Sequence, residues 1–188
     1  MVNQLISLDN KLTLFFQNLF PHNRLFDLLF SFFSLRGTTV FIWIIIIILA
    51  IIFEEKKYPG ISSRDKKFII SFILSLLITF FLVNVVLKNV IHRPRPQISS
   101  TNFNRLKLIP TNSCPTDFSF PSGHASISFA AATIISVFDK KRKWFYYLIA
   151  TTIAYSRIYL GCHFFADVFF GVLLGYLISK GVFKLFST

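Results

Sequence analysis

Acidic residues, cysteine and glycine are scarce in this sequence. Its 188 residues include 8 Asp and Glu, 2 Cys and 7 Gly, and charged residues make up only 15% of the chain. This composition excludes a disordered chain and argues against an ordinary soluble domain, in which about a quarter of the residues are charged. The two cysteines, Cys114 and Cys162, are too few for a disulfide framework and lack the spacing of zinc ligands.

Hydrophobic residues, in contrast, are abundant. They make up 54% of the chain, which contains 25 Phe, and the mean hydropathy is +0.62. One compact domain could not hide this much apolar side chain from water, so the bilayer must be the solvent for most of it. A net charge of +12 would suggest a nucleic-acid partner for a soluble protein. Here we assign the excess to basic loops that flank membrane spans, and we expect no nucleic-acid partner.

Charge-free windows predict the membrane spans. Windows 38–53 and 68–87 are the clearest, and the second alone meets the roughly 20 residues that a spanning helix needs. Three further candidates, two of them interrupted by a charge, are 125–138, 144–159 and 164–186. We therefore predict an all-α integral membrane helical bundle with five to six transmembrane helices plus an N-terminal interfacial helix.

Polar residues interrupt the apolar N-terminal region. Residues 5–20 are typical of an amphipathic interfacial helix, and residues 25–35 could form a short tilted first span. No basic run or small-residue cleavage site marks a signal peptide, so we expect this region to be retained. The chain is expected to form a single membrane domain over 1–188, with the interfacial and short first helix in 1–36, the core bundle in 37–188 and a catalytic loop in 89–121.

Basic residues in two loops predict the orientation. Residues 54–67 contain five basic residues, and residues 140–143 are four basic residues in a row. Both loops should be cytoplasmic by the positive-inside rule, which places 89–121 on the opposite face. That face also carries basic residues, so the inverted orientation remains an alternative.

Polar residues that could bind an anion occur at three predicted helix ends on one membrane face. Lys88, Arg95 and Arg157 would repel one another without an anion, and the planar Arg fork matches phosphate oxygens. Ser122 and Gly123 begin a helix whose free N–H groups favour phosphate. The alternative for each cluster is a capped helix with snorkelling Lys and Arg side chains.

Two histidines and an aspartate supply the elements of nucleophilic catalysis. His163 and Asp167 are four residues apart and share a helix face, and a carboxylate within a span needs a partner, for which His163 is the nearest candidate. A carboxylate that fixes the imidazole tautomer leaves the other ring nitrogen free to attack phosphorus. His124 could then protonate the leaving oxygen. The same three residues could instead bind zinc, but the surrounding cations disfavour a divalent ion, so we expect no metal and no cofactor.

A few other polar residues have no evident role. His22 and His92 lack neighbouring chemistry, and Arg93 is assigned no function beyond contact with head groups. Cys114 and Cys162 could form a disulfide that pins the long loop over the site, or could be two free thiols.

Three segments of this chain resemble a known family. They read KNVIHRPRP, PSGH and SRIYLGCHFFAD, and they match the three-part signature of the type-2 phosphatidic acid phosphatase superfamily, KxxxxxxRP, PSGH and SRxxxxxHxxxD. Every signature position is filled between Lys88 and Asp167. The resemblance implies a helical membrane bundle, usually of six spans, that removes phosphate without metal through a phosphohistidine intermediate. It implies these roles: His163 as nucleophile, Asp167 as its orienting partner, His124 as general acid, and Lys88, Arg95, Ser122, Gly123 and Arg157 as phosphate ligands.

The expected function is that of a membrane lipid phosphatase. The chain looks like the compact bacterial enzymes that act on undecaprenyl pyrophosphate, phosphatidylglycerophosphate or the lipid A 1-phosphate, and the motifs do not separate these substrates. We expect it at the outer, periplasmic face of a bacterial inner membrane, with the lipid as its partner and its oligomeric state open. A lipid phosphotransferase and a non-hydrolytic lipid-phosphate transporter are the alternatives.

Overall fold

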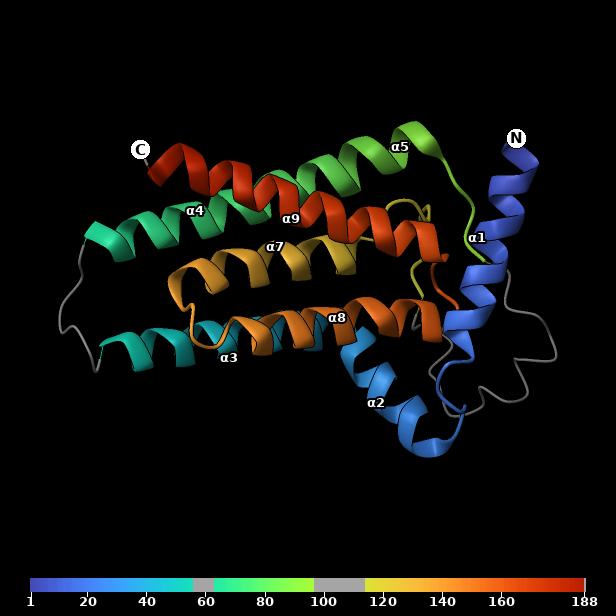
Figure 1. The fold of residues 1–188 in the computed structure, drawn as a ribbon, viewed down its shortest axis with the longest axis horizontal. Coiled ribbons are helices and arrows are strands. Elements are labelled where there is room, and N and C mark those ends of the chain that lie inside the picture. The colour runs from blue at the N-terminus through green and yellow to red at the C-terminus, as the bar shows by residue number, and fades with distance from the viewer. Residues whose placement is uncertain (56–62, 97–113, 188) are drawn as a thin grey trace.

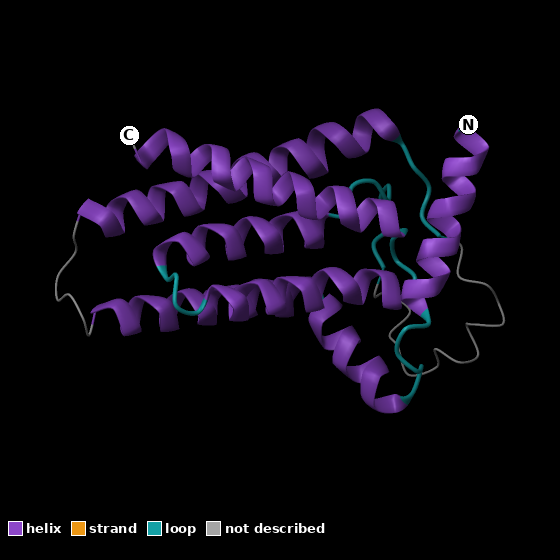
Figure 2. Cartoon of the chain, in the orientation of Figure 1, coloured by secondary structure: helices purple, strands orange, loops and turns teal. Residues whose placement is uncertain are grey.

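The computed structural model describes residues 1–55, 63–96 and 114–187. All regular structure in this part of the chain is helical (Figure 2). The elements are α1 (Val2–Gln17), α2 (Arg24–Ser34), α3 (Arg36–Glu55), α4 (Ser63–Phe80), the π-helix η1 (Phe81–Leu87), α5 (Lys88–Ile91), α7 (Gly123–Phe138), α8 (Lys143–Tyr159) and α9 (Phe165–Ser187). The predicted all-α bundle is thus confirmed.

Helix α7 forms the centre of the bundle. It packs against α3, α4, α8 and α9, and these helices run side by side (Figure 1). Small residues allow the close approach: a Cβ atom at Gly171 of α9 would lie 2.7 Å from the carbonyl oxygen of Ser122. Helices in membranes commonly use small residues for such contacts, because lipid provides no hydrophobic driving force for association.

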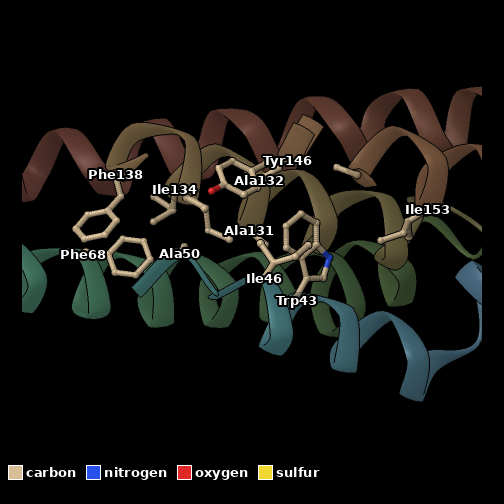
Figure 3. Packing of buried hydrophobic residues seen from close by; sticks show 12 residues of the cluster. Trp43, Ile46, Ala50, Phe68, Ala131, Ala132, Ile134, Phe138, Tyr146 and Ile153 are labelled. Atoms are coloured by element: carbon tan, nitrogen blue, oxygen red, sulfur yellow. The ribbon is translucent and has the colours of Figure 1, made fainter. Parts of the chain in front are cut away.

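A cluster of buried aromatic and aliphatic side chains joins α7 to α3, α4 and α8. The rings of Phe68 and Phe138 stack with centroids 4.3 Å apart (Figure 3). Trp43 of α3 donates a hydrogen bond from its indole nitrogen to Ser128 of α7 at 3.3 Å. Large apolar side chains, such as Phe41 and Leu77, are exposed on the outer surface of the bundle. Such a surface suits a lipid solvent.

Two segments of the described chain are long and apolar enough to cross a membrane on their own. The continuous run through α4, η1 and α5 covers Asp65–Ile91, and α9 contributes Phe165–Phe186. The pair Arg24–Ser34 and Gly37–Ala50, bent by 74°, would add a third span if it acts as one. By length and composition the spans thus number two or three, and the count of five to six stays a prediction.

The predicted interfacial helix corresponds to α1, which lies across one end of the bundle and contacts α8 and α9 (Figure 1). The turn between α7 and α8 lies at the other end. There Asp139 accepts hydrogen bonds from Arg142 and from the Tyr146 hydroxyl. Burial opposes ionisation of Asp139, but these contacts outweigh it and lower the pKa of the carboxyl group. Lys56 and Lys57 of the other basic loop, and residues 97–113 of the predicted catalytic loop, lie outside the described residues.

Candidate functional site

The predicted site residues lie at the end of the bundle that α1 crosses. Lys88 begins α5, and Ser122 immediately precedes α7. Arg157 lies in the last turn of α8, and Asp167 lies in the first turn of α9. His163 lies in the short turn between α8 and α9. The backbone N–H of Ser122 donates to the carbonyl oxygen of Asp167 at 2.9 Å. The starts of α7 and α9 are therefore directly joined.

The first motif, residues 88–96, continues beyond α5 as an extended segment that leads to the site. α5 ends where His92 adopts a left-handed conformation with φ of 52°, and the two prolines that follow cannot continue a helix. Ser119 holds this segment, since its N–H donates to the carbonyl of Arg93 at 2.8 Å and its hydroxyl to the carbonyl of Pro94 at 3.0 Å. The segment thus runs beside the chain that leads into α7.

Lys88 and Arg95 both form ion pairs with the carboxylate of Asp117. The Nζ atom of Lys88 and the Nη2 atom of Arg95 each lie 2.5 Å from an oxygen of Asp117, and Arg95 Nε donates to the Asp117 carbonyl at 2.7 Å. Partial burial works to raise the pKa of Asp117, but hydrogen bonds and charges from Lys88 and Arg95 prevail and lower it to about 2. Two converging cations thus form a binding position for an anion.

The His163 imidazole lies beside this position. Its Nε2 atom is 3.0 Å from Arg95 Nη1, which also donates to the carbonyl of Cys162 at 2.8 Å. The His163 side chain is only 2% exposed. Burial, followed by the charges of Arg157, Arg95 and Lys88, lowers the pKa of His163 well below its ordinary value of 6.5. The ring is therefore neutral near pH 7, and the lone pair of Nε2 accepts a hydrogen bond from Arg95 Nη1.

Asp167 lies on the other side of the imidazole but has a closer partner than His163. Its Oδ1 atom accepts a hydrogen bond from Arg93 Nη1 at 2.7 Å, and Oδ2 accepts from the N–H of Phe164 at 2.9 Å. Oδ2 is 3.5 Å from His163 Nδ1. The expectation that His163 is the nearest partner of Asp167 is therefore wrong, because the guanidinium ion forms the shorter and stronger contact.

Arg157 is buried behind the turn that carries the histidine. Its Nη1 atom donates to the carbonyl of Ser34 at 3.1 Å and contacts the Ser34 hydroxyl. The carbonyl of Arg157 accepts from the N–H groups of Cys162 and His163 at 3.0 and 3.1 Å. The residue therefore fixes the turn through its backbone while its charge acts on the imidazole.

The start of α7 brings Gly123 and His124 to the same end. A Cβ atom at Gly123 would lie 2.6 Å from Oδ1 of Asn84 in η1. The glycine is thus explained by close packing against a polar side chain of the neighbouring span. His124 follows it in the first turn of α7 and is partly buried.

The residues near the site that were missed from the sequence include Asp9, Asn84, Arg93 and Asp117, the last of which lies between Lys88 and Arg95. Arg93 was visible as a second Arg-Pro pair beside Arg95, and Asn84 as an amide within a charge-free span. Asp9 was one of only 8 acidic residues, in a helix otherwise assigned to the interface. Each of these signals marks a polar group that must find a partner in a lipid environment.

Cys114 and Cys162 form a disulfide, with Cα atoms 5.2 Å apart. The disulfide hypothesis is confirmed, and the alternative of two free thiols is wrong. The bond ties the described segment that contains Asp117 to the residue next to His163. Within the described ranges no group of three or more His, Cys, Asp or Glu side chains could hold a metal ion, including the trio of His124, His163 and Asp167.

The fold and site define a helical membrane protein with an anion position next to a neutral, oriented histidine. A family comparison identifies it further: the model of the PAP2 superfamily matches residues 68–188, and the chain belongs to this superfamily.

Relatives and solved structures agree with this family. The chain is 33% identical over 141 residues to an undecaprenyl-diphosphatase of Sulfolobus acidocaldarius, covering 74% of this chain and 61% of that protein. It is 27% identical over 178 residues to a lipid A 4'-phosphatase of Bacteroides thetaiotaomicron, covering 93% and 75% of the two chains. The crystal structure of Aquifex aeolicus LpxE superposes with a TM-score of 0.62 at 26% identity, over 94% of this chain and 95% of that one. A Bacillus subtilis PAP2-type phosphatase, with a TM-score of 0.61 at 21% identity over 97% of this chain and 86% of that one, shares the fold.

Proposed function

We propose that this protein is a membrane lipid phosphatase that removes a terminal phosphate from a lipid phosphate or pyrophosphate, with His163 as the nucleophile. The observation that carries the proposal is the arrangement of Lys88, Arg95 and His163. The two cations already hold a carboxylate, and Arg95 lies 3.0 Å from the imidazole Nε2 atom. An anion bound at this position would therefore lie within reach of the nitrogen lone pair.

Binding begins with the exchange of one anion for another. The substrate phosphate displaces the Asp117 carboxylate from Lys88 and Arg95, since Asp117 is 46% exposed and can turn toward water. We expect the start of α7, after Ser122, to favour the phosphate through its helix dipole. The charge of Arg157 adds to the electrostatic attraction, and the lipid tail stays in the bilayer beside the helices.

The reaction proceeds in two displacements. His163 Nε2 attacks phosphorus, the bond from phosphorus to the lipid oxygen breaks, and His124 donates a proton to that oxygen. His124 then takes a proton from water, whose oxygen attacks phosphorus and breaks the bond to nitrogen, so that inorganic phosphate leaves and the imidazole is restored. Asp167, whose Oδ2 atom lies 3.5 Å from His163 Nδ1, offsets the positive charge that develops on the ring.

The substrate class follows from the family and from the site's position at the bundle end. Undecaprenyl pyrophosphate, phosphatidylglycerophosphate and the lipid A 1-phosphate all present a phosphate at the membrane interface. The relatives are named as an undecaprenyl-diphosphatase, a lipid A 4'-phosphatase and a phosphatidylglycerophosphatase. These names support a lipid phosphate as the substrate, but they give the 4' rather than the 1 position of lipid A. We propose that the reaction takes place at the periplasmic face of a bacterial inner membrane. The basic turn between α7 and α8, which the positive-inside rule assigns to the cytoplasm, lies at the opposite end of the bundle (Figure 1).

Phosphate release from purified protein tests the proposal. The detergent-solubilised chain is incubated with each of the three lipids in EDTA, and inorganic phosphate is measured. His163→Ala should lose at least 1,000-fold in kcat, whereas His92→Ala, which changes a histidine with no role in the reaction, should retain activity. Full activity of His163→Ala, or no phosphate release by the wild-type protein from any of the lipids, would refute the proposal.

Two other functions give different outcomes in the same assay. A phosphotransferase would consume the lipid and pass the phosphate to an acceptor other than water, so inorganic phosphate would stay below the amount of lipid consumed. A transporter would bind the lipid without consuming it. The pair of His163 and Asp167 favours catalysis over transport, because binding alone needs no nucleophile, and the products decide between hydrolysis and phosphotransfer.

A further inference from the structure

We propose that α1 is part of the active site and that Asp9 and Arg93 position Asp167 against the His163 imidazole. The inference rests on the proposed function for its kinetic test. It assigns a role to a helix that lies outside the residues 68–188 matched by the family model. In this proposal Asp9 and Arg93 are positioning residues, because they act through Asp167.

Helix α1 caps the start of α9 from outside. Asp9 Oδ1 accepts a hydrogen bond from the N–H of Ala166 at 2.8 Å, and the Thr13 hydroxyl accepts from the N–H of Phe165 at 2.9 Å. The first N–H groups of a helix have no partner within the helix and must be satisfied by other groups. The Thr13 hydroxyl in turn donates to the carbonyl of Asp9 at 2.7 Å, which holds both caps in register.

Arg93 links this cap to the catalytic carboxylate. One guanidinium nitrogen lies 2.5 Å from Asp9 Oδ2, and the other lies 2.7 Å from Asp167 Oδ1. The guanidinium also lies 4.1 Å from the centre of the Phe164 ring. One carboxylate oxygen of Asp9 thus accepts a hydrogen bond from the backbone of α9, and the other forms an ion pair with Arg93. A planar fork with two donor nitrogens suits such a bridge, whereas a lysine would have to reach both carboxylates from a single nitrogen.

Apolar contacts fix the helix in this place. The ring of Phe16 stacks on that of Phe165 with centroids 5.0 Å apart, and the Tyr155 hydroxyl donates to the carbonyl of Phe16 at 2.7 Å. A helix held only by the lipid interface would have no reason to bury a carboxylate, which is costly without partners. The buried Asp9 therefore indicates specific docking on the site.

The charges explain why Asp9 matters for the nucleophile. Two carboxylates share one guanidinium, so the group of Asp9, Arg93 and Asp167 carries a net negative charge toward His163. Without Asp9, Arg93 would neutralise Asp167 alone and draw it away from an imidazole that is 3.5 Å distant. We expect Asp9→Asn to lower kcat about tenfold and to leave KM within twofold, because Asp9 does not touch the substrate.

A shifted carboxylate provides the matched control. The double variant Asp9→Asn with Asn10→Asp keeps the net charge of α1 but moves the carboxylate to the exposed neighbouring position, and it should behave like Asp9→Asn. Asn10→Ala alone should match wild type. Arg93→Lys, which keeps the charge but loses the fork, should also lose about tenfold in kcat, and this variant tests the bridge if Asp9→Asn does not fold. Wild-type kcat in folded Asp9→Asn or in folded Arg93→Lys would overturn the inference.

A second measurement separates this inference from the proposed function. Diethyl pyrocarbonate modifies neutral imidazole, and peptide mass spectrometry gives the rate at His163 relative to His92. Since the Asp167 carboxylate supports the nucleophilicity of the imidazole, its displacement should lower the His163 rate about threefold in Asp9→Asn. If the wild-type protein released no phosphate, the proposed function would fail while this rate still tested the positioning. An unchanged rate at His163 would overturn the positioning itself.

Discussion

Replacing Asp117 with asparagine should strengthen the binding of phosphate to this site. In the structure its carboxylate occupies Lys88 and Arg95, the two cations that the proposed mechanism assigns to the substrate. Phosphate must therefore compete with a tethered anion for the same donors. An amide at this position keeps the size of the side chain and removes the competing charge.

The size of the effect follows from the pKa of Asp117. A fall from 3.8 to about 2 would correspond to about 2.5 kcal/mol for a group shielded from water. Since the side chain is 46% exposed, solvent screening reduces this to about 1 kcal/mol. We therefore expect the inhibition constant of inorganic phosphate, and KM for the lipid, to fall about fivefold in Asp117→Asn.

Product inhibition by inorganic phosphate at fixed ionic strength provides the assay. Asp65→Asn, which removes one negative charge at the start of α4, is the matched control for changes in overall charge and should leave the inhibition constant unchanged. Because the pKa of Asp117 lies near 2, its carboxylate is charged throughout pH 4–8, and the gain should be constant over that range. An unchanged or weakened inhibition by phosphate would show that Asp117 supports the cations rather than competing for them.

Three further outcomes are expected. Cys114→Ser should lower the free energy of unfolding by about 2–4 kcal/mol, since the disulfide to Cys162 closes a loop across a separation of 48 residues, and thermal unfolding in detergent measures this. The acid limb of kcat/KM should lie below pH 6.5, because the pKa of His163 is lowered and protonation removes its lone pair only below that value; a limb above pH 6.5 would contradict the assignment. Gly123→Ala should lower kcat at least tenfold because its methyl group would meet Asn84, and Asn84→Ser should restore part of the loss if this contact is the cause.

Much of the bundle could be predicted from the sequence, because each signal was local. The charge-free window at 68–87 lies within a continuous apolar run, and the predicted short helix at 25–35 corresponds to α2 within one residue at each end. Hydropathy and helix length are properties of neighbouring residues, so the chain displays them directly. The gathering of Lys88, Ser122 and His163 at one end follows from alternating spans.

The partners of the buried charges could not be predicted, because they depend on how distant segments dock. Asp9 and Arg93 are 84 residues apart, and no spacing rule relates an interfacial helix to an extended Arg-Pro segment. The prediction that His163 and Asp167 share a helix face was wrong, because His163 lies in the turn before α9, although the two side chains are neighbours at 3.5 Å. A carboxylate has room for several donors, and the guanidinium of Arg93 is the strongest of those within reach.

The contacts of Asp167 with Arg93 and His163 meet two requirements that conflict in a membrane. Asp167 is fully buried, so it needs strong donors to remain ionised, yet a strong cation would cancel the charge that His163 requires. Arg93 and the Phe164 N–H supply the donors, and Asp9 returns a negative charge to the group by binding the other side of the guanidinium. When phosphorus bonds to His163 the ring becomes cationic, and the net negative group is already in place to stabilise it. The helix that supplies Asp9 would therefore affect the rate of the reaction more than the affinity for lipid.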